Sequence, residues 1–462
     1  MQSALSNSSR RERQPGARDG TTLLRASGIL QVARLCACAA LCAWDWIAVE
    51  IGGALAGEPA DRRRALLAAR LSQRLVDTLG ALKGVWAKLG QFAAMRLDVL
   101  PPTVTLALGS LRDRVPPLPL EAIRGVIEAE LGVCLEHAFP EFDPTPLGAA
   151  SIAQVHRARL AGGEDVAVKV QYPWLRASTR ADLRLLGALF RLWARVTGRT
   201  QGDARRLFDE FAAGLNEELD FAREADVARE IAANMADDAR VVVPDVFPAL
   251  STSRVLTLRY HDAVGITDRA GLARLGVDPG DVLDVLARAY ATQIFVDGLF
   301  HADPHPGNLF VLAEPDAARA PRLLFIDFGL SRRLDPTLRR ELRQGVYALM
   351  QRDLDAFLAG MDRMGMIAPG SHDGVREAVR GMFERIEAQG GALALGGGQV
   401  LSLKDEAKAL LWETRGLQLP SDLLLYAKTL SYVFALGEEL DPEADMMKRS
   451  LPYLLQFLAQ KE

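Results

Sequence analysis

The spacing of apolar residues predicts helices toward both ends of the chain, with a strand-rich region between them. From residue 61 to residue 97, apolar side chains recur every three or four positions, which is the spacing of one buried helix face, and Pro101 ends this pattern. A short helix is predicted at 121–131, and helical spacing returns at 177–236 and from residue 279 onward. Helices combined with a separate strand region indicate an α+β protein.

Strand-like alternation is clearest in the segment EDVAVKVQYP, where three valines face one side and Lys169 faces the other. The pair Gly162-Gly163 just before it predicts a hairpin turn, and the small residues at 148–151 predict a loop before the first strand of this hairpin. VVVPDVF and SRVLTLRY predict further strands. A boundary between this mixed half and a mostly helical C-terminal half is therefore expected near residue 263.

Composition and charge exclude some classes of protein. The chain has 462 residues, of which 49% are hydrophobic and 25% charged, so it is long enough for two or three globular domains. The net charge of -4 gives no reason to expect nucleic-acid binding. The four cysteines include no CxxC pair, so we expect reduced thiols rather than a cysteine-held metal.

The N-terminal region differs from the rest of the chain. Residues 1–26 are polar and rich in serine and arginine, and we expect a disordered basic tail. Residues 29–57 are the most apolar part of the chain, but one arginine and two acidic residues interrupt them, so a transmembrane span is not expected. Two interpretations stay open: a helix on a membrane surface, with Trp44 and Trp46 at the interface, and a helix packed on the protein's own core.

The stretch GLFHADPHPGNLFV, residues 298–311, gathers several chemically active side chains. His301, Asp303 and His305 alternate, as metal ligands on an extended segment do. The same stretch also fits H-x-D-x-x-x-x-N, with Asn308 completing the pattern of a phosphoryl-transfer loop. The whole chain has only six histidines and no HExxH or cysteine-rich partner, so a histidine-held metal is the weaker hypothesis.

Other parts of a phosphoryl-transfer site follow in the expected order. Lys169 lies on the strand VAVKV after the small-residue loop, where a lysine binds the α- and β-phosphates. Asp327 begins an Asp-Phe-Gly sequence, and with Asn308 it offers the oxygen ligands that Mg²⁺ prefers. Asp303 is expected near the transferred phosphoryl group. Each match alone is weak, but the ordered set predicts a kinase-like fold.

These motifs resemble those of the UbiB/AarF family of atypical protein-kinase-like proteins, which is associated with coenzyme Q biosynthesis. The resemblance runs from about residue 70 to 445 and rests on the segments AKLGQF, PLGAASIAQVHRA, VAVKVQYP, EELDFAREA, FHADPHPGNLF, LFIDFGLSRRL and LGEELDP. It implies an α+β, bilobal protein-kinase-like fold with an N-terminal helical extension and a mostly helical C-lobe. The expected parts are the basic tail at 1–26, the apolar helix at 27–60, the helical extension at 61–135, the N-lobe with inserted helices at 136–263 and the C-lobe at 264–462.

The resemblance implies a nucleotide site in the N-lobe. An alanine-rich loop is expected to cover the nucleotide together with Val155 and Lys169. The loop comprises Leu147, Gly148, Ala149, Ala150 and Ser151. Alanines restrict φ more than the glycines of ordinary kinase loops do. The family associates this loop with altered nucleotide preference and suppressed protein-kinase activity.

The resemblance also implies that the K-x-G-Q helix, with Lys88 and Gln91, folds over the active site and meets Glu218 and Asp220. We expect this regulatory arrangement to occlude a peptide substrate. No A-P-E segment follows DFGLSRRLDP, so the usual peptide-docking activation segment is also expected to be missing.

The acid that orients Lys169 stays open at this point. Glu218 is the first candidate for a catalytic role and Glu210 the second, but Glu218 is also a candidate partner for the lysine of K-x-G-Q. Glu217 and Glu224 are expected to be solvated surface charges.

The leading hypothesis is an Mg²⁺-dependent atypical kinase or ATPase that uses ATP or ADP and supports quinone (ubiquinone) or membrane-lipid biosynthesis. The alternatives are a nucleotide-gated lipid-binding scaffold without phosphotransfer and a small-molecule kinase of the aminoglycoside or choline type. Expected partners are a nucleotide, a quinone precursor or lipid and a membrane surface. The oligomeric state stays open and includes a homodimer. The expected location is cytoplasmic or peripheral on the inner membrane face, with the mitochondrion left open.

Overall fold

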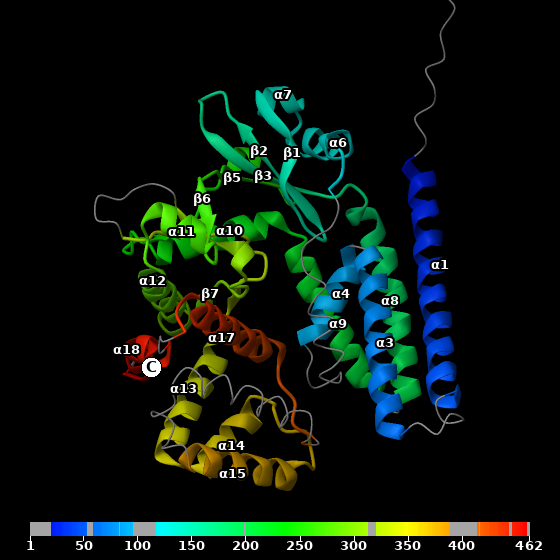
Figure 1. The fold of residues 1–462 in the computed structure, drawn as a ribbon, viewed down its shortest axis with the longest axis vertical. Coiled ribbons are helices and arrows are strands. Elements are labelled where there is room, and N and C mark those ends of the chain that lie inside the picture. Colours follow the sequence, from blue (N-terminus) through cyan, green and yellow to red (C-terminus); the bar gives the residue numbers. More distant parts are fainter. Residues whose placement is uncertain are drawn as a thin grey trace, which may run out of the picture.

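A computed structural model describes residues 20–52, 59–82, 84–95, 117–197, 200–312, 320–388, 414, 416–442 and 446–459. These residues form a small strand-rich lobe, a mostly helical lobe and a layer of long helices beside them (Figure 1). The α+β class expected from the sequence is confirmed. The expected tail at 1–26 was predicted too long, because α1(Gly20–Trp46) already begins at Gly20 and no proline interrupts its first turns. Residues 1–19 lie outside the described part.

The strand-rich lobe contains a four-stranded antiparallel sheet in the order β1-β2-β3-β5. Its strands are β1(Glu141–Ala149), β2(Ala153–Arg159), β3(Asp165–Gln171) and β5(Val255–Arg259). The three valines of β3 are fully buried and pack with Ile123 and Ile127 of α6(Leu120–Leu131). The predicted alternation of β3 and the hairpin between β2 and β3 are therefore confirmed.

β1 is a strand that the sequence pattern did not predict. Pro144 and Pro146 lie within it, and its pairing with β2 is irregular on both sides of Pro146. β1 stands at the edge of the sheet, where a strand tolerates proline because it has one side without ladder bonds. The segment expected as a loop is consequently shorter, since Leu147 to Ala149 belong to β1 and only Ala150 to Ile152 turn into β2.

The layer of long helices joins the N-terminal extension to helices inserted after β3 (Figure 1). Its elements are α1, the π-helical turn η1(Ile47–Gly52), α3(Ala60–Leu82), α4(Gly84–Met95), α8(Leu175–Thr197) and α9(Gln201–Glu218). Trp86 of α4 is fully buried against Leu186 of α8 and Phe211 of α9. This apolar contact fixes α4 beside α9, and α9 in turn leads directly toward the functional site.

The segment 61–97 was predicted as one helix, and this is wrong, because the structure breaks it into α3 and α4 at Gly84. Gly84 has a φ of 53°, in the left-handed region that favours glycine. Its amide donates a hydrogen bond of 3.0 Å to the carbonyl oxygen of Ser151. Apolar periodicity did not reveal the break, because both helices bury residues in the same apolar cluster.

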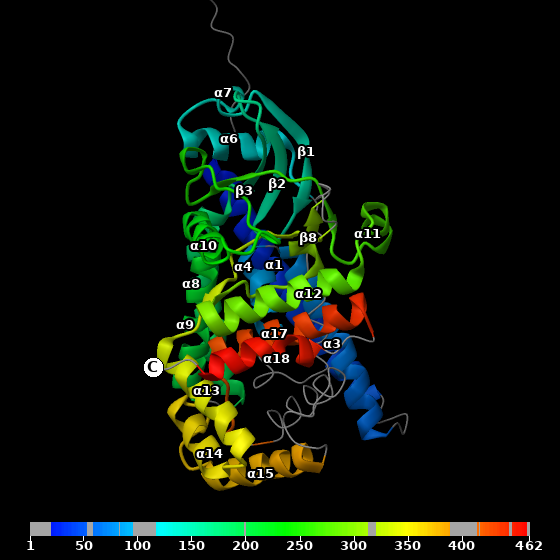
Figure 2. The same cartoon turned by 90° about the vertical axis from the view of Figure 1, so that its left-hand side faces the viewer.

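The helical lobe is built around α12(Pro279–Ala291), and α17(Ser421–Leu440) and α18(Met446–Ala459) pack against this helix (Figure 2). A second sheet, in the order β4-β9-β8-β6, covers this core. The chain passes from the first sheet to the second between Arg259 and Ala263. The remaining elements are α7(Leu135–Ala138), α10(Phe221–Asn234), β4(Val241–Val242), η2(Pro248–Leu250), β6(Ala263–Gly265), α11(Arg269–Leu275), η3(Thr292–Asp297), β7(Leu299–Phe300), η4(Pro306–Asn308), β8(Leu309–Leu312), β9(Leu323–Phe325), β10(Arg332–Arg333), α13(Pro336–Gln351), α14(Leu354–Arg363) and α15(His372–Ala388).

The break at Gly84 yields a stability prediction. Gly84→Ala is expected to lower the free energy of unfolding by about 1–3 kcal/mol, because alanine is strained at positive φ. A Cβ there would also lie 2.9 Å from Leu175 Cδ2. The matched control is Gly125→Ala in the middle of α6, where no atom lies within 4 Å of the new Cβ and φ is not positive. The control is expected to be neutral or stabilising by about 1 kcal/mol. Equal denaturation midpoints for the two variants would contradict the prediction.

Candidate functional site

The loop between β7 and η4 is held in place by His301, which is completely buried. Its Nε2 lies 3.0 Å from the carbonyl oxygens of both Ile326 and Asp327, so this nitrogen must donate. Nδ1 then accepts from the Tyr290 hydroxyl at 3.0 Å. Burial lowers the pKa of His301 and keeps the ring neutral. Both ring nitrogens are used within the protein, so His301 braces the loop and has none left for a metal.

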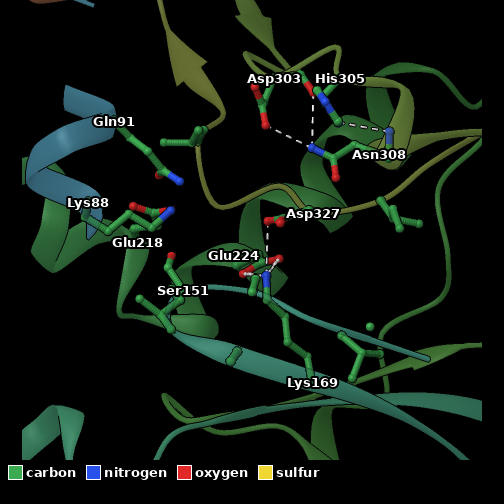
Figure 3. A pocket seen from close by; sticks show the side chains of 18 of the residues that line it. Lys88, Gln91, Ser151, Lys169, Glu218, Glu224, Asp303, His305, Asn308 and Asp327 are labelled. Atoms are coloured by element: carbon green, nitrogen blue, oxygen red, sulfur yellow. Dashed lines mark hydrogen bonds and ion pairs between the residues drawn. The ribbon is translucent and has the colours of Figure 1, made fainter. Parts of the chain in front are cut away.

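Asp303 and Asn308 face each other across this loop, as Figure 3 shows. The Asn308 amide donates to the Asp303 side chain at 3.0 Å and to its backbone carbonyl at 3.2 Å. Lys428 of α17 places its ammonium 3.5 Å from the other Asp303 carboxylate oxygen. His305 caps η4 by accepting from the Gly307 amide at 3.1 Å, which makes it a loop-shaping residue. The structure thus brings the expected base and the expected amide ligand together.

Lys169 of β3 forms an ion pair with Glu224 of α10. Its ammonium lies 2.8 and 2.9 Å from the two Glu224 carboxylate oxygens and 3.0 Å from Asp327. Glu224 is almost completely buried, so the expectation of a solvated charge there is wrong. Neither Glu218 nor Glu210 orients Lys169. Glu210 and Glu218 belong to α9. Glu224 instead lies on the buried face of α10 and therefore reaches Lys169.

Lys169, Glu224 and Asp327 shift one another's pKa values. Burial alone would raise the pKa of Asp327, but the adjacent Lys169 ammonium outweighs burial and lowers it to about 2. Burial raises the pKa of Glu224 to about 7 despite the attraction of Lys169. Burial disfavours the charged form of Lys169, yet the two carboxylates raise its pKa above the ordinary value. Asp327 also has a φ of 62°, a strained conformation for a residue with a side chain, which is typical of functional sites.

The K-x-G-Q helix α4 reaches into the same site from the opposite side (Figure 3). Lys88 forms a close ion pair with Glu218, and both side chains are largely buried. Gln91 lines the same cavity. Asp220 instead caps α10 by accepting from the amides of Ala222 and Arg223. The structure therefore brings Lys88 to Glu218 and uses Asp220 for the start of the helix that carries Glu224.

A cavity of about 670 Å³ is lined by the Lys88–Glu218 pair, by Lys169 with Glu224 and Asp327, and by Asp303 and Asn308. Its walls include Val155 and Lys169, the last residues of β1 (Leu147, Gly148 and Ala149) and the turn residues Ala150 and Ser151. The Tyr172 hydroxyl donates to the Ala150 carbonyl oxygen at 2.9 Å, and Ser151 accepts from the amide of Gly84. The alanine-rich turn is thus fixed both to its own sheet and to the first residue of α4.

α4 and α9 also contribute apolar side chains to the cavity. Phe92 of α4 and Phe211 of α9 contact each other there, with ring centroids 5.5 Å apart, and Leu215 lies one turn along α9.

Arg332 of β10 pairs closely with Glu217, the acid expected to be solvated, and lies 4.0 Å from Asp422 of α17. β10 leads into α13 through Leu334 and Asp335, as the sequence predicted for a chain without an A-P-E segment.

Sequence reasoning missed Glu224 and Lys428. A signal for Glu224 existed, because it lies three residues after Phe221 and four before Ala228, both buried, and so belongs to the inward face of α10. Lys428 follows the buried Leu424 by one helical turn, but nothing in the sequence says which element that face meets.

Comparison with known proteins gives consistent relatives. A family model described as the ABC1 atypical kinase-like domain matches residues 110–360. The chain is 31% identical over 434 residues to Protein ACTIVITY OF BC1 COMPLEX KINASE 8, chloroplastic, of Arabidopsis thaliana, over 88% of this chain and 56% of that protein. It is 34% identical over 385 residues to a probable protein kinase UbiB of Aeromonas hydrophila, over 82% of this chain and 69% of that protein. The solved complex of Rv3197 with erythromycin from Mycobacterium tuberculosis is 26% identical, with a TM-score of 0.51, over 83% of this chain and 95% of that one.

The Lys88–Glu218 pair is expected to stabilise the position of α4. Lys88→Met and Glu218→Gln should each lower the free energy of unfolding by about 1–3 kcal/mol, because each leaves a largely buried charge without its partner. The double variant should lose less than the sum, with a coupling energy of about 0.5–3 kcal/mol measured by chemical denaturation.

The control is the exposed ion pair Arg205–Asp209, whose two residues lie four positions apart on α9. Its coupling energy is expected to stay below about 0.5 kcal/mol. Equal coupling energies for the two pairs would show that Lys88 and Glu218 do not hold α4 in place.

Proposed function

Since the chain belongs to the ABC1 atypical kinase-like family, we propose that it binds ATP or ADP with Mg²⁺ and acts as an atypical kinase or ATPase in quinone or membrane-lipid biosynthesis. Family membership agrees with the resemblance seen in the motifs and supports a kinase-class assignment. The nucleotide, the metal and the biosynthetic role are the proposal's own steps.

The observation that carries the proposal is the position of Lys169 between Glu224 and Asp327, across one cavity from Asp303 and Asn308. A lysine held by a buried carboxylate presents a fixed positive charge, which suits the phosphates of a nucleotide. The amide oxygen of Asn308 and the carboxylate of Asp327 are hard oxygen donors and fit Mg²⁺. Bound there, Mg²⁺ would neutralise phosphate charge.

Asp303 has the position of a base for the acceptor group. Its carboxylate is oriented on one side by the Asn308 amide and on the other by Lys428. A base held in this way can accept the proton of an acceptor hydroxyl or of water. Lys428 is a positioning residue here, because its ammonium sets the orientation of the Asp303 carboxylate.

The surroundings of the cavity favour a small acceptor over a peptide. α4 covers the cavity and is held by the Lys88–Glu218 pair and by the bond between Gly84 and Ser151. Phe92 of α4 and Phe211 and Leu215 of α9 give the cavity apolar surface, next to polar groups such as Gln91 and Glu210. This lining suits an apolar molecule with one reactive polar group, such as a quinone precursor or a lipid. We therefore propose that protein-kinase activity is suppressed.

Two substitutions test the nucleotide site. Asp327→Asn is expected to lower affinity for the Mg²⁺-nucleotide by roughly 10–100-fold, because it removes a charged metal ligand. Glu224→Gln is expected to lower it roughly tenfold, because Lys169 loses its charged partner. Isothermal titration with ATP and ADP, with and without Mg²⁺, measures both. Asp226→Asn, an exposed acid two residues along α10, is the matched control and should leave affinity unchanged. Unchanged binding in Asp327→Asn would contradict the proposal.

Substitutions at the base separate catalysis from scaffolding. Asp303→Asn is expected to reduce nucleotide turnover by roughly 10²–10⁴-fold while nucleotide affinity stays within a few-fold. Lys428→Met should lower kcat more than it changes KM for nucleotide, because it acts through Asp303. Complementation of a quinone-deficient strain, with quinones measured by mass spectrometry, provides the cellular readout. A variant without turnover that restores quinone would favour the nucleotide-gated scaffold and contradict the enzymatic proposal.

A further inference from the structure

The segment that joins Asp327 to α13 lacks the usual means of being ordered by phosphorylation. It comprises residues 328–335, and Ser331 is its only hydroxyl-bearing residue. Ser331 is 1% exposed, so a modifying enzyme cannot reach its side chain. In ordinary protein kinases, arginine side chains hold the phosphate of the activation segment. Here Ala302 stands where the motif H-R-D has arginine. Other contacts must therefore set the position of this segment.

Glu217, the second to last residue of α9, lies between two arginines. Its carboxylate pairs closely with Arg332, which belongs to the segment, and lies 3.3 Å from the guanidinium of Arg223 on α10. The Arg223 guanidinium also donates to the backbone carbonyl oxygens of Gly329 and Ser331, each at 3.5 Å. One carboxylate thus binds the segment through Arg332 and orients the arginine that reaches its backbone.

A second carboxylate approaches the same arginine from the helical lobe. Asp422, in the first turn of α17, lies 4.0 Å from Nε of Arg332. Two carboxylates, from α9 and α17, therefore surround the two guanidinium groups from α10 and β10. A phosphorylated hydroxyl carries a charge of about -1.5 to -2 at neutral pH. The two carboxylates supply a similar negative charge, and they do so without any modification.

The corner between α9 and α10, which carries Glu217, is held by the first sheet. The side-chain amide of Gln171, a buried residue at the end of β3, donates to the carbonyl oxygen of Leu219. The backbone amide of Phe221 donates to the carbonyl oxygen of Ser253 at 3.1 Å. Neither contact involves residues 328–335. The corner therefore presents Glu217 from a position that does not depend on the segment.

The contacts of Glu217 reach the expected metal ligand through a short stretch of backbone. Gly329 lies two residues after Asp327, and Arg332 lies five residues after it. Beyond Arg332, the Leu334 amide donates to the Gly298 carbonyl oxygen at 2.8 Å, and β10 pairs with β7. Asp327 has a positive φ, and such a strained backbone persists only where its surroundings hold it. Fixing the next residues of the chain supplies that support on one side.

We propose that Glu217 is a positioning residue that orders the segment after Asp327 and takes the place of the phosphate in an activation segment. Asp422 supplies the second negative charge, and Arg223 transmits the constraint to the backbone at Gly329. The segment is consequently ordered without phosphorylation. The effect on Mg²⁺ rests on the proposed nucleotide site, whereas the ordering of the segment does not.

Hydrogen exchange of the full chain, followed by mass spectrometry on peptides that cover residues 328–335, tests the ordering directly. Glu217→Gln should raise the exchange rate of these peptides roughly tenfold, because two arginines lose their charged partner, while peptides of α12 exchange as in wild type. Glu230→Gln is the matched control, since Glu230 pairs with the neighbouring Arg333 at the surface. It should leave exchange unchanged. Treatment of the wild type with a phosphatase should also leave exchange unchanged.

Nucleotide titration with the same variants tests the link to the metal. Glu217→Gln should lower the affinity for ATP roughly 3–10-fold in the presence of Mg²⁺ and leave it unchanged without Mg²⁺, because it acts through Asp327. A merely structural role would lower both affinities equally. Should Glu217→Gln fail to fold, Arg223→Lys decides. Lysine keeps the positive charge but cannot bind two carbonyl groups as a guanidinium does, so exchange in the segment should again rise.

Two results would overturn the inference. One is unchanged exchange of residues 328–335 in both Glu217→Gln and Arg223→Lys. The other is faster exchange of these residues after phosphatase treatment, because a phosphate would then order the segment. A wild type that binds no nucleotide would contradict the proposed function alone, since exchange would still decide the role of Glu217.

Discussion

The ion pair between Lys169 and Glu224, extended to Asp327, is the interaction on which the rest of the site depends. It joins three separate parts of the chain: β3 of the first sheet, α10, and the segment after β9 of the second sheet. Removing two buried charges from water is costly unless each finds a partner at short distance. The lobes must therefore stay in register for Lys169 to remain satisfied, and the same register brings Asp303 and Asn308 to the opposite wall of the cavity.

A second set of contacts closes the cavity from the side of the helical layer. Gly84 turns the chain so that its amide reaches Ser151, and one helical turn later Lys88 reaches Glu218. Glu218 ends α9 while Asp220 starts α10, so one short connection supplies the partner of Lys88 and the cap of the helix that carries Glu224. A displacement of α4 would thus shift Glu218, the start of α10 and, through Glu224, the position of Lys169. The α4 wall of the cavity and the position of Lys169 are therefore linked through α9 and α10.

The sequence predicted those parts that depend on local order. The alternation of β3, the hairpin before it and the short helix near residues 121–131 all follow from short-range patterns. The order of motifs along the chain singled out Lys169, Asp303, Asn308 and Asp327, and in the structure all four line one cavity. What the sequence did not supply was the pairing of acids, since Glu210, Glu217, Glu218 and Glu224 lie within fifteen residues and differ only in which helix face they occupy. That choice depends on the packing of α9 and α10 against different neighbours.

The apolar segment near the N-terminus shows the same limit of prediction from sequence. Counting apolar and charged residues in 29–57 could not decide between a membrane-facing helix and a core-facing one, because a count does not record direction. In the structure, one side of α1 packs on α3 and holds Asp45 against Arg74, while the other side presents Trp44 and Ile47 to the outside. The inward side agrees with the interpretation of a helix packed on the protein's own core, and the membrane-surface interpretation stays a prediction. None of the described helices is long and apolar enough to cross a bilayer. An acid inside an apolar segment therefore argues against membrane contact only when it points outward, and its position relative to a neighbouring arginine decides this.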